Sequence, residues 1–399
     1  MCRPMRFHEA DIRLDTARFI PRGRVERVFE PAAPSALQQQ VNASEAGAMS
    51  WLEWRHSVKA VVFHEHGGID KLRYEERPDP VVKENEVLIR VQACALNHLD
   101  LWGRRGLPGI QIPLPHISGN DICGEVKSVG KLVSKARPGD AVIVSPGLSC
   151  GMCEHCLSGR DSMCRSYKII GYLVDGGYAE LVSVPEVNLI PKPEWLKPEE
   201  AAAVPLVFMT AWHMLVTRAG VTPGEVVLVL GAGSGVGSAA IQIAKLWGAR
   251  VIATAGSEDK LEHAKALGAD ETINHNQQDI AEEARKLTGK RGVDIVFEHV
   301  GSVTWEKSIK ALAVGGRLVT CGATTGYAGQ TDIRFLYSKQ LSILGSYMAS
   351  KGELLRVVEL VRQRRLKPVV DKVYPLADAA KAQERMEKRE HFGKIVLRP

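Results

Sequence analysis

The sequence has few cysteines, and they are not spread along the chain as a disulfide framework requires. Eight cysteines occur in 399 residues, and four of them fall between residues 150 and 164. The other four, at positions 2, 94, 123 and 321, are solitary. This distribution argues against a small disulfide-stabilised secreted fold. It favours a metal site in a protein of a reducing compartment, which we expect to be the cytoplasm.

The sequence also lacks the marks of a nucleic-acid-binding or membrane protein. The formal net charge is +6, but the basic residues are scattered, and the densest basic run, RQRRLK at 362–367, follows a predicted helix whose dipole it complements. Residues 226–244 are nineteen in a row without a charge, which is long enough to cross a bilayer. Glycines and serines crowd the middle of this stretch, which argues against a membrane span. With the scattered basic residues, this means that we expect neither a membrane nor a nucleic acid as partner.

Residues 1–56 contain no lysine and show little periodicity of either the helical or the strand kind. They hold eight arginines and seven acidic residues, and no apolar signal-peptide core. We expect a disordered extension, or an over-long start with Met49 as the alternative first residue, and we predict no function for it.

The stretch Val226–Gly248 carries the clearest structural signal. Its first five residues, VVLVL, predict a strand that is buried on both faces. Four glycines follow at 231, 233, 235 and 237, where they allow a sharp turn whose backbone N–H groups can face an anion. Apolar residues then recur at helical spacing. This order predicts a dinucleotide-binding unit, although GAGSGVG departs from the strict glycine pattern by one inserted residue.

The chain changes its pattern near residue 200. Strand-like runs separated by Pro- and Gly-rich loops fill residues 57–200, whereas strands alternate with helices over residues 201–345. Such alternation predicts an α/β fold with a parallel, doubly wound sheet, whose sixth strand we expect at LSILGSYM. The tail, residues 346–399, has the composition of the first part, so we expect it to fold back onto that β-rich domain and leave a cleft between the two domains.

Residues 58–399 resemble the medium-chain dehydrogenase/reductase superfamily, which includes zinc alcohol dehydrogenases and quinone or enoyl reductases. The matching motifs are NHLDLWGRRG, PHISGNDICGEVKSVG, the cysteine cluster, AAAVPLVFMTAWHML, GAGSGVG and the closing FGKIVL. The resemblance implies a GroES-like catalytic domain, a Rossmann cofactor domain, a homodimer or homotetramer, and an NAD(P)H-dependent oxidoreductase that acts on a small molecule.

Four cysteines predict one structural Zn²⁺. They stand in C-x2-C-x2-C-x7-C spacing, which lets three thiolates converge and a fourth complete a tetrahedron: Cys150, Cys153, Cys156 and Cys164. Two disulfides or redox-active thiols are the alternatives. The family has its structural zinc lobe at this spacing, and we expect that lobe at about residues 148–166.

By the same resemblance, the catalytic zinc ligands of alcohol dehydrogenases fall at Asn97, Asn120 and Leu206. An amide is a poor zinc ligand and leucine is none, so we expect no metal there, with improvised ligands from neighbouring Cys, His and Asp residues as the alternative. Without a Lewis acid, reduction of a simple carbonyl loses transition-state stabilisation. A conjugated acceptor delocalises charge onto an oxygen that hydrogen-bond donors can hold. We therefore predict an enone, an enoyl thioester or a quinone as acceptor.

The resemblance also implies the catalytic residues. NHLDLWGRRG carries the N-x-x-D-x-x-x-R-x-G pattern of zinc-free reductases. We predict Asn97 as hydrogen-bond donor to the acceptor oxygen, His98 as proton source or donor, and Asp100 as the residue that orients them. The alternatives are a turn cap, a surface or cofactor-ribose contact and a helix N-cap, respectively. Trp102 stands where some relatives have a tyrosine, so solvent is a further candidate for the proton.

The second strand of the dinucleotide unit ends without the carboxylate that an NAD-preferring unit uses. Ser257 and Lys260 follow this strand and can hold a 2′-phosphate. The alternative is that Ser257 only caps a helix and Lys260 is only a solvated lysine. We predict NADPH as the cofactor, with NADH as the alternative. Glu298 is predicted to contact the nicotinamide ribose or to cap a helix. The expected cofactor site comprises Thr210, Gly231, Gly233, Ser234, Gly235, Val236, Gly237, Ser257, Lys260, Glu298 and Gly322.

Two other functions are compatible with these residues. One is an alcohol dehydrogenase with unorthodox metal ligands, and the other is a protein that binds NADPH without turnover.

Overall fold

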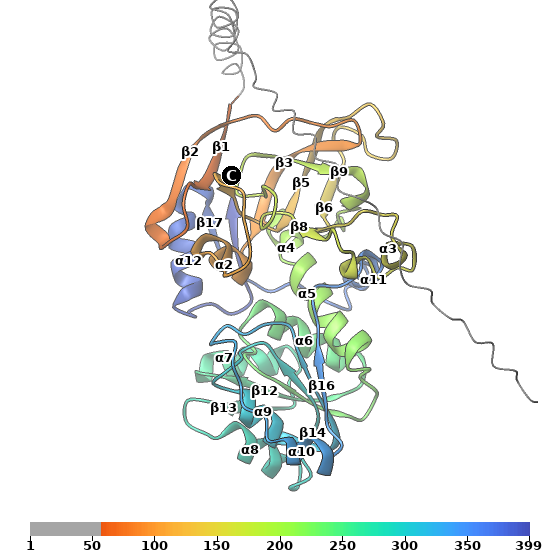
Figure 1. The fold of residues 1–399 in the computed structure, drawn as a ribbon, viewed down its shortest axis with the longest axis vertical. Coiled ribbons are helices and arrows are strands. Elements are labelled where there is room, and N and C mark those ends of the chain that lie inside the picture. Colours follow the sequence, from red (N-terminus) through yellow and green to blue (C-terminus); the bar gives the residue numbers. More distant parts are fainter. Residues whose placement is uncertain (1–56) are drawn as a thin grey trace, which may run out of the picture. The chain divides into compact units, whose positions relative to one another are not determined.

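The structure is a computed structural model, and it describes residues 57–399 (Figure 1). The expected extension and the alternative start at Met49 lie outside the described residues.

A six-stranded sheet has the strand order β13-β12-β11-β14-β15-β16, and every pair in it is parallel. From the central pair β11 and β14, the chain proceeds outward in opposite directions, so the sheet is doubly wound as predicted. The expected sixth strand is present as β16. The strands are β11 (Val226–Val229), β12 (Arg250–Ala255), β13 (Glu271–Asn274), β14 (Val293–Glu298), β15 (Leu312–Thr320) and β16 (Ser342–Gly345).

Helices connect these strands and explain their composition. All four residues of β11 are buried, whereas three of the four residues of the edge strand β16 are exposed. A central strand between two helical layers must be apolar on both faces, which is what the run VVLVL indicates. The helices are α6 (Gly235–Leu246), α7 (Glu258–Ala266), α8 (Ile280–Leu287), α9 (Trp305–Ala311) and α10 (Ile333–Ser338).

One boundary in this sheet differs from the sequence pattern. ALAVGG looks like the end of a helix, but α9 ends at Ala311 and β15 begins at Leu312. Leu312 pairs with Val293, and the next pair joins Arg317 to Ile295, so residues 313–316 form a bulge. Within the bulge Gly315 has a φ of 76°, a conformation that glycine adopts without strain. The helical pattern of the sequence does not indicate this bulge.

A seven-stranded sheet forms the β-rich part, in the order β10-β6-β5-β3-β18-β17, with β9 also paired to β3. Strand β18 is antiparallel to β3, so the C-terminal tail joins the sheet formed by residues 86–191. The strands are β3 (Glu86–Ala95), β5 (Asp121–Val129), β6 (Ala141–Val144), β9 (Leu181–Pro185), β10 (Leu189–Pro191), β17 (Val370–Pro375) and β18 (Lys394–Arg398).

Smaller elements complete the described fold. Strands β1 (Ser57–Phe63), β2 (Leu72–Pro78) and β4 (His116–Ile117) form a three-stranded sheet, and β7 (Gly147–Leu148) pairs with β8 (Lys168–Ile169). The remaining helices are α2 (His98–Arg105), α3 (Glu154–Leu157), α4 (Pro198–Ala202), α5 (Pro205–Trp212), the π-helix η5 (His213–Arg218), α11 (Lys351–Arg362) and α12 (Ala379–Glu387), with short 3₁₀ turns η2 (Ile69–Lys71), η3 (Asp161–Met163), η4 (Glu186–Asn188) and η6 (Leu376–Asp378).

Helix α5 links the two parts. All its residues are buried, and it belongs to one hydrophobic cluster with Ile143 of β6 and Val229 of β11. The helical stretch Pro198–Arg218 has the length and hydropathy of a membrane span, and 78% of its most apolar 18 residues is buried in the fold. The uncharged stretch 226–244 is divided between β11, a turn and α6.

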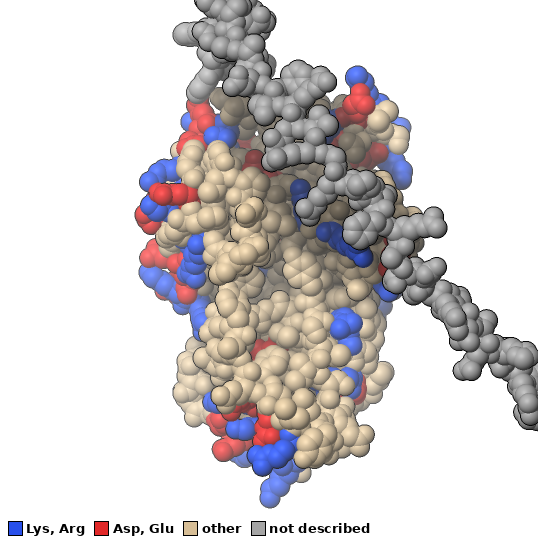
Figure 2. Space-filling view, viewed as in Figure 1, with Lys and Arg blue, Asp and Glu red and all other residues tan. Residues whose placement is uncertain are grey.

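We propose residues 57–200 with 346–399 as one domain and residues 201–345 as the other, because all strands of the six-stranded sheet fall within the latter range. On the face shown in Figure 2, Lys and Arg are interspersed with Asp and Glu and form no continuous basic strip.

Candidate active site

The glycine turn joins β11 to α6. Gly231 has a φ of 57°, and Ser234 caps the helix by accepting a hydrogen bond from the Gly237 N–H at 2.9 Å. A Cβ at Gly237 would lie 2.4 Å from the Gly231 carbonyl oxygen, so only glycine allows the turn to pack this closely on the helix. The N-terminus of α6 therefore offers backbone N–H groups and a positive dipole end to an anion.

A cavity of about 140 Å³ opens at this turn. Residues from both proposed domains line it, and they include no Asp or Glu. Half of the predicted catalytic and cofactor residues line it: Asn97, His98, Thr210, Ser234, Gly235, Val236 and Gly322. Gly231, Gly233 and Gly237 form the turn behind them. The cavity is therefore the candidate active site.

Asn97 is buried, and its side chain takes part in a polar cluster on the cavity wall. Its Oδ1 accepts a hydrogen bond from Lys394 Nζ at 2.6 Å, and its Nδ2 donates to Asp121 Oδ2 at 3.0 Å. Lys394 Nζ also donates to Asp121 Oδ2 at 2.9 Å. The side chain is thus engaged in this cluster. Asn97 is at the same time the N-cap residue of α2, in a capping box with Asp100, so the cap that the sequence left open as the alternative is present as well.

Asp100 lies behind the cavity wall. Its carboxylate accepts hydrogen bonds from the Asn97 N–H (2.7 Å), the Gly119 N–H (3.1 Å) and the Tyr178 hydroxyl (3.0 Å). Burial raises the pKa of Asp100 to about 6, and these donors oppose the shift. None of the partners is His98. The expectation that Asp100 orients both residues is corrected accordingly: it holds Asn97 through the main chain and fixes the start of α2.

His98 lines the cavity as the first residue of α2. Burial lowers the pKa of His98 to about 3, and the neighbouring His391, His299, Arg389 and Lys394 lower it further. The imidazole is therefore neutral over the physiological range and offers one N–H donor and one acceptor. A neutral imidazole is a poor source of protons, so of the two roles predicted for His98 this state favours the hydrogen-bond donor over the proton source.

The state of His98 predicts a pH dependence. We expect the kcat/KM of acceptor reduction to show no inflection from His98 between pH 5.5 and 8.5, and His98→Gln to leave the shape of the profile unchanged. In the unfolded chain His98 binds a proton below about 6.5, whereas the folded chain excludes that proton down to about 3. His98 therefore removes stability as pH falls through this window. An acidic limb near pH 6.5 that His98→Gln abolishes would contradict this assignment.

Glu298 does not face the cavity. Its buried carboxylate accepts hydrogen bonds from the N–H groups of Val300 and Gly301 at 2.6 and 3.0 Å, and from Thr304 and Ser308 hydroxyls. These donors satisfy both of its oxygens, so the prediction of a ribose contact is corrected in favour of the capping role. The next residue, His299, lines the cavity instead.

The end of β12 carries the residues predicted to choose the cofactor. Ser257 is exposed at the N-cap of α7, and the Lys260 side chain packs beside Gly233 of the turn, with Nζ donating to the Arg389 carbonyl. Both acids of the first turn of α7 are directed elsewhere. Glu258 Oε1 accepts from Asn274 Nδ2 at 2.7 Å, and Asp259 lies exposed beside His263. The charged side chains that approach the glycines of the turn are thus the lysines Lys260 and Lys394, and no carboxylate does so.

The four predicted zinc ligands converge. The sulfur atoms of Cys150, Cys153, Cys156 and Cys164 all lie within 4.8 Å of one another, and Cys153 and Cys156 are 3.5 Å apart. A tetrahedral Zn²⁺ with Zn–S bonds of about 2.3 Å separates its sulfurs by about 3.8 Å, so the cluster fits zinc. The seven described cysteines are free of disulfides. Among residues 57–399, no other group of three His, Cys, Asp or Glu side chains converges in this way.

The three positions at which alcohol dehydrogenases hold their catalytic zinc ligands, where we expect no metal, make other contacts in this structure. Asn97 Oδ1 faces Lys394, and Asn120 Nδ2 donates to the Ile170 carbonyl at 2.7 Å. Leu206 contributes only its backbone N–H, which donates to Asp121 Oδ1 at 2.8 Å. A metal here would have to displace a buried ammonium group, so this donor set does not fit a catalytic zinc.

Sequence reasoning missed three residues of the site. Lys394 occurs in the closing motif FGKIVL, which indicated the family but no role for the lysine. Asp121 was covered only by the alternative of improvised metal ligands from neighbouring Cys, His and Asp residues. His391 is buried beside them with no partner for Nδ1, and burial lowers its pKa to about 4. Their proximity to Asn97 depends on the pairing of β18 with β3, which no local pattern in the sequence indicates.

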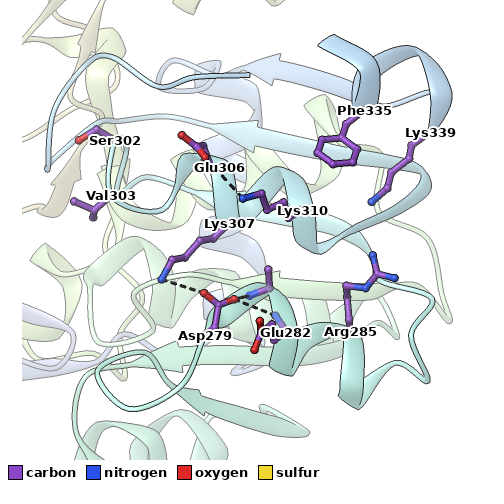
Figure 3. A pocket seen from close by; sticks show the side chains of 11 residues that line it. Asp279, Glu282, Arg285, Ser302, Val303, Glu306, Lys307, Lys310, Phe335 and Lys339 are labelled. Atoms are coloured by element: carbon purple, nitrogen blue, oxygen red, sulfur yellow. Dashed lines mark hydrogen bonds and ion pairs between the residues drawn. The ribbon is translucent and has the colours of Figure 1, made fainter. Parts of the chain in front are cut away.

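A second depression lies between α8, α9 and α10 (Figure 3). Two of its lysines pair with acids: Lys307 Nζ is 3.2 Å from Asp279 Oδ2, and Lys310 Nζ is 3.8 Å from Glu306 Oε2 (Figure 3). No residue predicted from the sequence lines it. The cavity at the glycine turn therefore remains the candidate site.

Comparison with known proteins relates both parts of the chain to dehydrogenases. Residues 83–194 match the family model described as Alcohol dehydrogenase GroES-like domain, and residues 235–363 match the model described as Zinc-binding dehydrogenase. The chain is 33% identical over 348 residues to the NAD-dependent alcohol dehydrogenase of Sulfolobus acidocaldarius, covering 86% of this chain and 99% of the relative.

Two further similarities differ in the activity that they name. The crotonyl-CoA carboxylase/reductase of Cereibacter sphaeroides is 32% identical over 358 residues, which are 82% of this chain and 83% of that protein. A crystal structure of an NAD-dependent alcohol dehydrogenase is 52% identical with a TM-score of 0.83, covering 86% of this chain and 99% of the other.

Proposed function

Because this chain belongs to the medium-chain dehydrogenase/reductase superfamily, we propose that it is an NADPH-dependent reductase that transfers hydride to a conjugated acceptor without a catalytic metal. The acceptor is an enone, an enoyl thioester or a quinone. The similarity to crotonyl-CoA carboxylase/reductase supports the thioester, and the free cysteines support a cytoplasmic location.

The observation that carries the proposal is the polar cluster of Asn97, Asp121 and Lys394, of which Asn97 and Lys394 line the cavity and Asp121 lies behind them. This cluster occupies the place where alcohol dehydrogenases of the superfamily hold their metal, and it offers a hydrogen-bond donor instead. An amide N–H can stabilise the delocalised charge of an enolate, whereas the localised charge of an alkoxide gains more from a Lewis acid.

The residues of the chain have distinct parts in this reaction. The reduced nicotinamide supplies hydride when the cofactor is bound, with its diphosphate at the N-terminus of α6. Asn97 donates a hydrogen bond to the acceptor oxygen as negative charge gathers there. Leu206, Ile169 and Met348 line the cavity with apolar surface and exclude water from the acceptor. With His98 neutral, the proton that completes the product comes from solvent.

NADPH is the proposed cofactor because Lys260 packs beside the glycine turn. We expect Lys260→Ala to lower kcat/KM for NADPH about tenfold by removing a charge partner of the 2′-phosphate, and to leave kcat/KM for NADH unchanged. Lys265→Ala is the control, since Lys265 is exposed on the same helix. A wild type that prefers NADH, or an equal loss with both cofactors, would contradict the assignment.

A homodimer or homotetramer is also part of the proposal. Strand β16 ends the six-stranded sheet, and the exposed apolar side chains of Val314, Ile333 and Tyr337 belong to the same half of the chain. Exposed apolar surface near an edge strand supports association between copies. Sedimentation analysis measures the assembly directly, and a monomer at micromolar concentration would contradict it.

Alcohol dehydrogenation is the second candidate function, and the similarity to proteins named NAD-dependent alcohol dehydrogenase favours it. A protein that binds NADPH without turnover is the third. Zinc content per chain, measured together with NADPH oxidation by acryloyl-CoA, crotonyl-CoA, a small quinone and an aldehyde, separates the three. One zinc and turnover of conjugated acceptors only supports the proposal. Two zincs with aldehyde turnover identifies an alcohol dehydrogenase, and NADPH binding without turnover identifies the third.

A further inference from the structure

Lys394 is a buried lysine whose ammonium group is fully engaged. The residue is 3% exposed, and Nζ donates to the Leu96 carbonyl at 2.6 Å, to Asn97 Oδ1 at 2.6 Å and to Asp121 Oδ2 at 2.9 Å. An ammonium group has three protons, so none remains for a cofactor phosphate. Burial of this charge is tolerated only because the carboxylate of Asp121 pairs with it.

The pair determines the orientation of the Asn97 amide. An ammonium group can only donate hydrogen bonds, so the amide oxygen must face Lys394. The carboxylate can only accept, so Nδ2 must face Asp121, as the distance of 3.0 Å to Oδ2 indicates. The reversed amide would place an NH₂ group against the ammonium and an oxygen against the carboxylate, and both contacts are repulsive. One N–H of Nδ2 then serves Asp121, and the other is left for a ligand in the cavity.

Asp121 is itself held in place. Its Oδ1 accepts the Leu206 N–H at 2.8 Å, which ties the carboxylate to the start of α5. Two apolar side chains could fill this volume without the desolvation of two charges, and a buried ion pair is weak evidence for a role in stability. Lys394 lines the cavity, and both members of the pair contact the amide that we place at the acceptor oxygen, which indicates a role in the reaction.

We propose that the Lys394–Asp121 pair positions Asn97 for catalysis by fixing which end of its amide faces the acceptor; this inference rests on the function proposed above. Lys394 and Asp121 are positioning residues, because they act through Asn97 and not on the acceptor. The pre-organised N–H then meets the developing oxyanion without a rotation of the amide.

The test is a cycle of variants. Lys394→Met alone leaves a buried, unpaired carboxylate and can fail to fold, so the informative variant is Lys394→Met/Asp121→Asn, which removes both charges. We expect its kcat with the conjugated acceptor to fall at least tenfold, while the NADPH Kd and the acceptor KM stay within about threefold. The control is Lys388→Met/Glu384→Gln, which removes an exposed pair of 2.9 Å from α12 and its C-cap.

The same pair is then removed in an Asn97→Ala background. If the pair acts through Asn97, it has no further effect on kcat there, whereas an independent structural effect adds to that of Asn97→Ala. Additive losses, or a loss in NADPH Kd instead of kcat, would overturn the inference and leave the proposed function standing. Wild-type turnover of alcohol or aldehyde alone would refute the proposed function. The same set of variants measured with that substrate would still show whether Lys394 and Asp121 act through Asn97. Absence of turnover with every acceptor would overturn both.

Discussion

Asn97→Ala is expected to lower the kcat for a conjugated acceptor about 100-fold, which is the usual effect of removing one donor to a developing oxyanion. The NADPH Kd is expected to stay within about threefold of wild type, because the cofactor diphosphate binds at α6 and not at Asn97. Stopped-flow measurement of NADPH oxidation gives kcat, and fluorescence titration gives Kd.

A second variant separates the loss of the donor from disruption of the cluster. Alanine leaves Lys394 without one of its acceptors, whereas Asn97→Asp keeps an oxygen acceptor for the ammonium, lacks the N–H and places its second oxygen against Asp121. Both variants should lose turnover if the N–H is what matters. Asn85→Ala, at an exposed asparagine, serves as the control. Unchanged turnover in Asn97→Ala would remove Asn97 from the mechanism.

Features that depend on neighbours in the sequence could be predicted. The glycine turn needs only a buried strand, four glycines and a helix in succession, and the zinc cluster needs four cysteines within fifteen positions. In both cases the backbone between the residues is too short to place them anywhere else. The alternation of strands and helices likewise indicated the parallel sheet with its sixth strand, β16.

Features that depend on strand pairing across the chain could not be predicted. Lys394 and Asp121 are 273 positions apart, and they meet because β18 and β5 both pair with β3. No property of FGKIVL indicates that its lysine is buried. The neutral state of His98 has the same origin, because the residues that desolvate it and the cations that surround it come from distant segments.

The errors at Asp100 and Glu298 have a local cause. Asp100 was placed at the site by the resemblance of NHLDLWGRRG to zinc-free reductases, and Glu298 was placed there because it ends a parallel strand, where ligands bind. Each carboxylate instead accepts N–H groups of its own turn: Asp100 from Asn97, and Glu298 from Val300 and Gly301. A buried carboxylate near unpaired backbone donors satisfies them before it is available to a ligand. Each carboxylate lies within three residues of the backbone N–H groups that it accepts, so the sequence spacing could have indicated the capping role. This local pairing decided the role more than the position of the residue at the end of an element did.

The zinc lobe leads to the other large expected effect. Its contacts reach the cavity, since Asp161 Oδ1 accepts the Lys351 N–H at 3.0 Å at the start of α11, and Tyr167 packs edge-on against Tyr347, which lines the cavity. Loss of the metal should therefore loosen the lobe and one wall of the acceptor site together. The reaction itself should not require the metal, because the four thiolates leave no open position.

Cys153→Ser, or prolonged chelation, is expected to remove the zinc and to lower the melting temperature by on the order of 10 °C. At a temperature where the chain stays folded, kcat should fall less than about threefold, while the acceptor KM rises as Tyr347 loses its support. Calorimetry with elemental analysis measures the first effect and steady-state kinetics the second. A chelator that abolished turnover while the melting temperature stayed at its wild-type value would mean that the catalytic group is a metal, and the reading of Lys394 and Asn97 as its replacement would be wrong.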